Sequence, residues 1–227
     1  MKVLVVTLEF GAVFSGNGTH GRNQVRALLD RGATIDVICG LPPTTDERTF
    51  RNELQRNYAK YYGRYLFIHC VSVSKWKRVD KNCDWEGFTT GAKDLISQLS
   101  HKNDIVVGID WTGMMGISQQ QCPKPVVYLN YRVFHCNTGD MSDDDRHFYL
   151  EHERNACSSS DLIIALSDHD NVQLAKITNA NIPVVTLHPP LRQEIVALTN
   201  STKPKPTKYL TCCVRISPEK NTTALWT

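Results

Sequence analysis

The opening stretch KVLVVTLEFGAVFSGNGTHGRNQVRALLDRGATIDVIC (residues 2–39) decides the fold class. KVLVVTL (2–8) and TIDVIC (34–39) are short continuous apolar runs, typical of strands buried on both faces. Between them, a glycine-rich loop (11–21) precedes a helix that is expected to end near Gly32. The apolar residues of this helix recur at helical spacing: Val25, Leu28 and Leu29. A strand, a helix and a second strand in this order build a parallel sheet.

The same alternation continues along the chain. Further strands are predicted at LFIHCVSV (66–73), DIVVGI (104–109), PVVYLN (125–130), DLIIAL (161–166) and PVVTL (183–187). Helices are predicted at 50–62, around 88–99, between 109 and 125 as a short glycine-containing segment, and at 143–158. The fold class is therefore α/β, a Rossmann-like parallel sheet flanked by helices.

The chain length suggests an incomplete second domain. At about 150 residues per domain, 227 residues correspond to roughly one and a half domains. We expect a first domain over 1–199 and an interdomain linker at 200–208, which is polar and contains two prolines. Residues 209–227 would then supply the first strand, YLTCCV (209–214), and a turn of a truncated second domain.

Composition excludes several classes of protein. Hydrophobic residues make up 41% and charged residues 22%, and the net charge is +3, so neither disorder nor nucleic-acid binding is indicated. No apolar run approaches the roughly 18 residues of a membrane span, and no leader peptide is recognisable, so we expect a cytoplasmic protein without a transmembrane segment. The eight cysteines lack C-x-x-C spacing and are expected to be reduced and buried.

The glycines Gly16, Gly18 and Gly21 match the dinucleotide-binding pattern G-x-G-x-x-G. Such glycines let the backbone approach a phosphate at a helix N-terminus. However, seven residues separate Leu8 from Gly16, and Asp36, twenty residues after Gly16, sits inside the second strand. A flexible loop over a cleft is therefore favoured over a nicotinamide cofactor site, and a plain surface loop is the other alternative.

Two charged segments have a structural and a functional interpretation. Asp143-x-Asp145 could hold a divalent cation, but Ser142 before it predicts a helix cap instead, so no metal site is expected. KWKRVDK (75–81) is either a solvated loop or a contact for an anionic acceptor or a membrane surface.

The segment RISPEK (215–220) is the most specific signal in the chain. Arg215 ends a predicted strand, and Lys220 opens a helix after a Ser-Pro turn. Ligands of open α/β sheets bind at this edge, and two cations there suit a diphosphate leaving group. An ordinary charged turn is the alternative.

Several of these segments together resemble the retaining GT-B glycosyltransferases of family 4, also called glycosyl transferases group 1. The similar segments, in the family's order, are KVLVVTL, DIVVGIDWTGMMG (104–116), EHERNACSSSDLIIALS (151–167) and YLTCCVRISPEKN (209–221). The resemblance implies two Rossmann-like lobes, of which the N-terminal one binds a sugar, lipid or small-molecule acceptor and the C-terminal one binds a UDP- or GDP-sugar. No cofactor and no metal are implied.

The resemblance also implies roles for particular residues. Arg215 and Lys220 would contact the donor diphosphate, Gly16 and Gly18 would line the cleft near the donor, and Asp110 would lie on its acceptor side. Many members carry a histidine after the strand that corresponds to PVVYL, whereas this chain has Asn130-Tyr131-Arg132. Arg132 is the candidate to support the reaction there, and His135 is the alternative.

A departure from the family leads to the functional expectation. The Glu-x7-Glu segment that grips the nucleotide would lie after Thr227, so the 227 residues are expected to be inactive alone and to need a missing C-terminal lobe or a partner chain. One alternative is a non-catalytic subunit or isoform of a split glycosyltransferase that binds an acceptor or a partner. Another is a nucleotide-dependent oxidoreductase, based on the glycine pattern.

Overall fold

The architecture is that of a computed structural model, which describes residues 1–11, 15–75, 84–136 and 141–189. Seven parallel strands form one sheet in the order β3-β2-β1-β4-β5-β6-β7. Their bounds are β1 Lys2–Thr7, β2 Thr34–Leu41, β3 Leu66–Ser72, β4 Ile105–Ile109, β5 Val126–Leu129, β6 Leu162–Ala165 and β7 Val184–Thr186. The α/β fold with a Rossmann-like parallel sheet is thus confirmed, and the seven strands fall on the predicted apolar runs.

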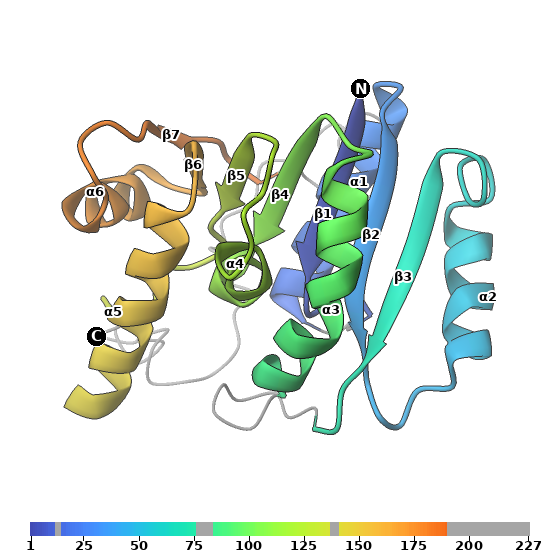
Figure 1. Ribbon diagram of the computed structural model, residues 1–227, viewed down its shortest axis with the longest axis horizontal. Helices are drawn as coiled ribbons and strands as arrows, with labels where there is room; N and C mark the ends of the chain where they lie inside the picture. The colour runs from blue at the N-terminus through green and yellow to red at the C-terminus, as the bar shows by residue number, and fades with distance from the viewer. Residues whose placement is uncertain (12–14, 76–83, 137–140, 190–227) are drawn as a thin grey trace, which may run out of the picture.

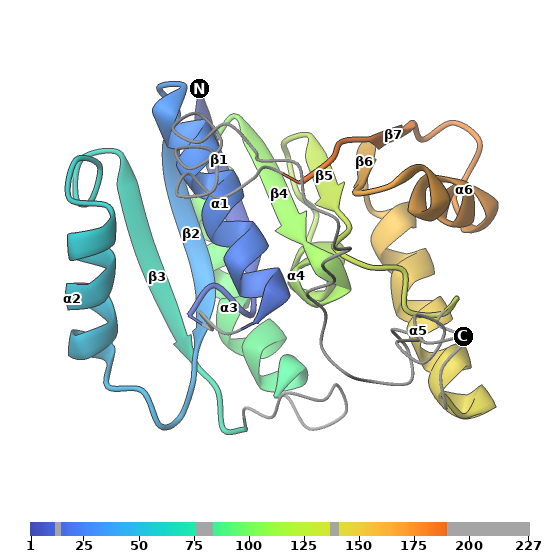
Figure 2. The same ribbon diagram turned by 180° about the vertical axis from the view of Figure 1, so that it is seen from behind.

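Six helices of the described residues cover the sheet. Their bounds are α1 Gly16–Asp30, α2 Glu47–Asn57, α3 Trp85–Ser100, α4 Asp110–Ser118, α5 Asp143–Ser158 and α6 Asp168–Ile177. Figure 1 shows α3 and α4 in front of the sheet, and the view from behind in Figure 2 shows α1 on the opposite face. Buried residues of α1 and α2 share one core with β1, β2 and β3, whereas α3, α4, α5 and α6 contribute to the core on the other face.

The helices differ from the sequence predictions at three places. The segment predicted as a glycine-rich loop is helical from Gly16 onward, because the Ser15 hydroxyl accepts the Gly18 N–H at 3.1 Å and caps α1 there. Helix α2 begins at Glu47, after its cap Asp46, and ends at Asn57 rather than at residue 62. Helix α6 follows β6 directly and was not predicted.

Helix α4 packs unusually close to the sheet. A Cβ atom at Gly113 would overlap the carbonyl oxygen of Val6 in β1, so only glycine allows this approach. The close packing fixes the N-terminus of α4 beside the carboxyl ends of β1 and β4. Asp110 and Gly16, which the resemblance places along the cleft, both lie at this edge of the sheet.

The predicted linker at 200–208 and the second-domain segment 209–227 lie outside the described residues. None of the helices that the structure describes is long and apolar enough to cross a membrane.

Candidate functional site

The strand order reverses between β1 and β4. The chain leaves β1 for β2 and β3 on one side, and β4 lies on the other side of β1. In open α/β sheets, ligands bind in the crevice outside the carboxyl ends of the strands at such a switch point. Here that edge carries the first turn of α1 and the turn from β4 into α4. Both segments contain residues that the sequence singled out.

Asp110 follows β4 and adopts an unusual backbone conformation. It is the only non-glycine residue with a positive φ, at 61°, among the described residues. Its side chain is buried, with 4% of its surface exposed, and its Oδ1 accepts the Trp111 N–H at 2.9 Å. Strained backbone persists where the surrounding structure enforces it, and such residues cluster at functional sites.

Aromatic packing holds the turn at Asp110 in place. The Trp111 ring stacks on His152 with centroids 5.1 Å apart, and it meets Phe148 and Trp85 edge-on at 5.9 and 5.8 Å. These contacts join the first turn of α4 to α3 and α5. The residue after Asp110 is therefore anchored on the face away from α1.

The first turn of α1 lies directly across the switch point from Asp110. Asn17 Nδ2 donates a hydrogen bond to Asp110 Oδ2 at 3.2 Å, which joins the two connections. Asn17 is 5% exposed, and its Oδ1 has no hydrogen-bond partner within the described parts of the chain. A buried amide oxygen without a partner is costly, so it marks a position where a ligand hydroxyl or a water molecule would bind.

Gly16 faces the loop that follows β5. A Cβ atom at Gly16 would overlap the Tyr131 hydroxyl, so a larger residue there would have to displace the Tyr131 side chain. Burial raises the pKa of Tyr131, and the negative charges of Glu9 and Asp110 raise it further. Tyr131 therefore keeps its proton at neutral pH, with the negative charges of Glu9 and Asp110 close enough to act on it.

His20 completes the cluster one turn further along α1. It is 5% exposed, and its ring centroid lies 5.7 Å from that of Tyr131. Burial lowers the pKa of His20 to about 4, so its imidazole is neutral near pH 7. Within the described residues, its Nε2 has no hydrogen-bond partner. A neutral ring nitrogen of this kind can accept a hydrogen bond from a bound hydroxyl.

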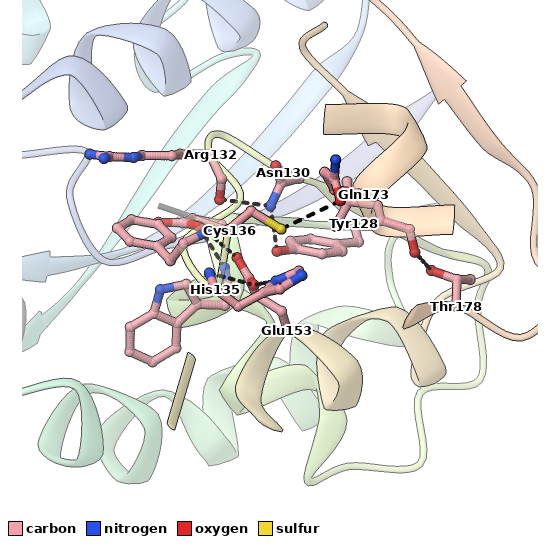
Figure 3. A network of polar contacts seen from close by, with 12 residues as sticks. Tyr128, Asn130, Arg132, His135, Cys136, Glu153, Gln173 and Thr178 are labelled. Carbon is pink, nitrogen blue, oxygen red and sulfur yellow. Dashed lines mark hydrogen bonds and ion pairs between the residues drawn. The ribbon is translucent and has the colours of Figure 1, made fainter. Parts of the chain in front are cut away.

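Arg132 lies on the loop after β5, and its guanidinium packs 5.4 Å from the ring centroid of Phe134. Figure 3 shows this guanidinium pointing away from the neighbouring polar network around Glu153. Only the Arg132 carbonyl joins that network, because it accepts the Asn130 side-chain N–H at 3.0 Å. Among the described residues, no acidic side chain pairs with this guanidinium, which could therefore contact a ligand anion.

The network around Glu153 fixes the loop that carries Arg132. Glu153 in α5 is fully buried, and its carboxylate accepts the backbone N–H groups of Phe134 at 2.7 Å and His135 at 3.3 Å. The same carboxylate pairs with His135 Nδ1 (Figure 3). His135, the alternative to Arg132, is therefore engaged in holding the loop.

The aspartates at the start of α5 form a helix cap. The Ser142 hydroxyl accepts the Asp145 N–H at 3.1 Å. Within the described ranges, no group of three or more histidine, cysteine, aspartate or glutamate residues could hold a metal ion. The predicted Ser142 cap is therefore present at the start of α5.

Other candidates lie elsewhere. A surface depression of about 320 Å³ between α4 and α5 includes Ser118, His152 and Asn155, so it lies toward the C-terminal part of α4 and away from Asp110. Arg215, Lys220 and most of the basic segment 75–81 fall outside the described residues. The structure thus gathers Asp110 and Gly16 at one site, and it adds Asn17, His20 and Tyr131, which the sequence did not indicate.

Comparisons with known proteins identify the fold. No family model matches the chain, and no curated protein is similar in sequence. A solved structure of the sucrose-phosphate synthase from Thermosynechococcus elongatus matches with a TM-score of 0.55 and 11% identity, covering 88% of this chain and 96% of that one. Arabidopsis thaliana UGT89C1 in complex with quercetin matches with a TM-score of 0.52 and 12% identity over 89% of this chain and 55% of that one.

Several of the structural neighbours are glycosyltransferases, and the Rossmann-like sheet of this chain matches theirs. A UDP-N-acetylglucosamine 2-epimerase from Rickettsia bellii also matches, with a TM-score of 0.51, 12% identity, and 88% of this chain and 47% of that one covered. The chain therefore spans about half the length of several matched proteins. At these identities the likeness concerns the fold alone.

Proposed function

We propose that this chain is the acceptor-side lobe of a glycosyltransferase that moves a sugar from a UDP- or GDP-sugar to an acceptor with retention of the anomeric configuration. The observation that carries the proposal is the buried polar cluster at the β1/β4 switch point, where Asp110 and Asn17 meet. The fold supports it, because the matched structures include glycosyltransferases, one of them solved with UDP. The epimerase from Rickettsia bellii shares the fold as well, so the fold by itself does not decide the activity.

Each residue of the cluster has a proposed part. The Asp110 carboxylate and the free Asn17 Oδ1 would accept hydrogen bonds from acceptor hydroxyls, while neutral His20 offers a further acceptor atom. Arg132 would add positive charge where a diphosphate leaves. Gly16 and Gly18 would let the donor approach the first turn of α1.

The donor side is proposed to need a second lobe. Arg215 and Lys220 are the proposed diphosphate contacts at its first turn. The described residues form a single sheet, and the matched glycosyltransferase UGT89C1 is about twice as long as the part matched here. We therefore propose that the 227 residues do not transfer sugar alone. The alternative of a non-catalytic acceptor- or partner-binding subunit remains a proposal of its own.

An oxidoreductase is disfavoured by the contacts of Asp36. A dinucleotide site needs this carboxylate for a ribose hydroxyl at the end of the second strand. Here, both Asp36 oxygens are engaged inside the structure, with His69 Nε2 at 2.8 Å and Asn103 Nδ2 at 3.2 Å. The first helix also begins at Gly16, well after the end of β1 at Thr7.

The test combines acceptor binding with sugar transfer by the 227-residue chain. Methyl glycosides and quercetin are titrated by NMR, and the expected shift changes centre on Asn17, His20 and Asp110. Asp110→Asn should weaken this binding, whereas the exposed control Asp94→Asn should not. Transfer from radiolabelled UDP-glucose and GDP-mannose should be absent.

Two outcomes would contradict the proposal. Robust transfer by the chain alone would refute the need for a second lobe. The acceptor site would be refuted if the NMR shift changes fall outside the switch point. It would also be refuted if an Asp110→Asn variant folds and binds the acceptor like the original chain. Either result would favour the partner-binding subunit. Circular dichroism of each variant establishes that it is folded.

A further inference from the structure

Two cysteines stand side by side on neighbouring strands, away from the switch-point site. β2 and β3 pair in parallel with Cys39 directly opposite Cys70. Neighbouring strands lie about 4.8 Å apart, which falls within the range of Cα separations that a disulfide spans. Both side chains pack with the core under α1 and α2, so they point to the same face of the sheet.

The two thiols have different surroundings. Cys39 is fully buried, whereas Cys70 is half-buried. A hydrogen bond with Cys39 lowers the pKa of Cys70, and the positive charge of Arg51 lowers it further. The same hydrogen bond and burial raise the pKa of Cys39. Cys70 is thus the thiol that ionises first, with a protonated partner beside it.

Arg51 is fixed beside this pair by two anchors. Its Nη2 lies 2.7 Å from Glu47 Oε1, one turn earlier in α2. Its Nη1 donates a hydrogen bond to the carbonyl oxygen of Ile68 in β3 at 3.1 Å. The guanidinium therefore sits over the strand that carries Cys70, two residues from it. The guanidinium charge favours a Cys70 thiolate, and the neighbouring Glu47 carboxylate opposes it in part.

We propose that Cys39 and Cys70 form a peroxide-sensitive dithiol that closes reversibly into a cross-strand disulfide between β2 and β3. The Cys70 thiolate attacks one oxygen of hydrogen peroxide, the O–O bond breaks, and hydroxide leaves and takes up a proton as water. The resulting sulfenic acid is attacked by Cys39, which loses its proton, so that an S–S bond forms, the S–O bond breaks, and a second water leaves. A thiol reductant reverses the reaction.

Two of the other described cysteines serve as internal comparisons. Burial raises the pKa of Cys157 to about 11, and burial also raises the pKa of Cys136. Both should hold less thiolate at neutral pH than Cys70 and react with peroxide more slowly. The proposal concerns this sheet edge alone and does not depend on a glycosyltransferase activity.

The experiment uses the full chain, treated with hydrogen peroxide and digested by trypsin without reductant. Cleavage after arginine and lysine places the two cysteines in separate peptides, 32–48 and 65–75. We expect these peptides to become cross-linked first and to separate again with dithiothreitol. Phenylarsine oxide, which needs two adjacent thiols, should protect the same pair from oxidation.

Variants test the order of events. Cys39→Ser should stop the chemistry at a Cys70 sulfenic acid, captured by dimedone. Arg51→Gln should raise the Cys70 pKa, and each unit of increase lowers the thiolate fraction about tenfold. The remaining thiolate is more nucleophilic, with a Brønsted slope of about 0.5, so the net rate of cross-linking should fall about threefold per unit. Arg51→Lys keeps the charge and should react faster than Arg51→Gln.

The tryptic peptide map of the chain without substitutions tests the proposal even if a variant misfolds. Peroxide that leaves peptides 32–48 and 65–75 unlinked while other cysteines react would overturn it. So would a Cys70→Ser variant that folds and is oxidised at Cys39 as fast as the original chain.

Discussion

Acidification should destabilise the chain through His20. The pKa of His20 falls from its ordinary 6.5 to about 4 in the folded protein because the ring is buried. The unfolded chain therefore takes up a proton that the folded chain resists. The contribution of the neutral ring is complete above about pH 6.5, and it is lost as the pH falls from there toward about 4. For these two pKa values, the loss at about pH 5 amounts to about 2 kcal/mol.

Urea unfolding at about pH 7.5 and about pH 5 measures this loss, with His20→Gln as the reference. Glutamine does not titrate, so every other group contributes equally to both proteins. We expect the stability difference between the two proteins to shift by about 2 kcal/mol toward the variant at the lower pH. If the free energies of unfolding of the two proteins change in parallel with pH, the proposed effect of His20 is refuted. An NMR titration of the His20 ring with a midpoint near the ordinary value of 6.5 would refute it as well.

Three further substitutions test the geometry of the site and of its supports. Gly16→Ala should lower the free energy of unfolding by about 1–3 kcal/mol, measured with urea, because the new methyl group meets the Tyr131 hydroxyl. Adding Tyr131→Phe should recover part of this loss. If the effects of the two substitutions on stability simply add, the contact is contradicted. Ser142→Ala should lower stability by about 1 kcal/mol by removing the cap of α5, and Mg²⁺ should leave the melting temperature of both proteins unchanged; stabilisation by the metal would instead favour a metal site. Glu153→Gln should lower the free energy of unfolding by at least about 2 kcal/mol, because an amide cannot accept all the hydrogen bonds that reach this buried carboxylate from the loop before α5. A decrease below about 0.5 kcal/mol would contradict the role of Glu153 in holding the loop.

The strands could be predicted because each is a continuous apolar run between polar segments. A parallel sheet buries both faces, so this pattern carries the assignment directly. Helix α6 was missed because its apolar side chains are few: Val172 is 55% exposed, and Leu174 is the only fully buried residue of the helix. The local sequence does contain a signal for the start of α6, because the Ser167 hydroxyl caps the helix by accepting the Asp170 N–H.

The candidate site could be predicted in part. Gly16 was indicated by the glycine pattern after the first strand, and Asp110 by the resemblance of residues 104–116 to the glycosyltransferase segment. His20 could not be found in this way, because its burial depends on a loop more than 100 residues further along the chain. Glu153 looked like one more acid of a polar helix, and only the position of the Phe134 backbone gives it a role.

The hydrogen bond between Asn17 and Asp110 also bears on how the protein folds. The two residues are 93 positions apart, and the strand that precedes Asp110 must pair with β1 before they can meet. During synthesis, the edge of β1 that pairs with β4 therefore stays unpaired after β2 and β3 have been made. Contacts of such long range form slowly, and exposed strand edges recruit other chains. We expect nascent chains that stop before β4 to aggregate, and the binding site to arise only in the last cooperative step of folding.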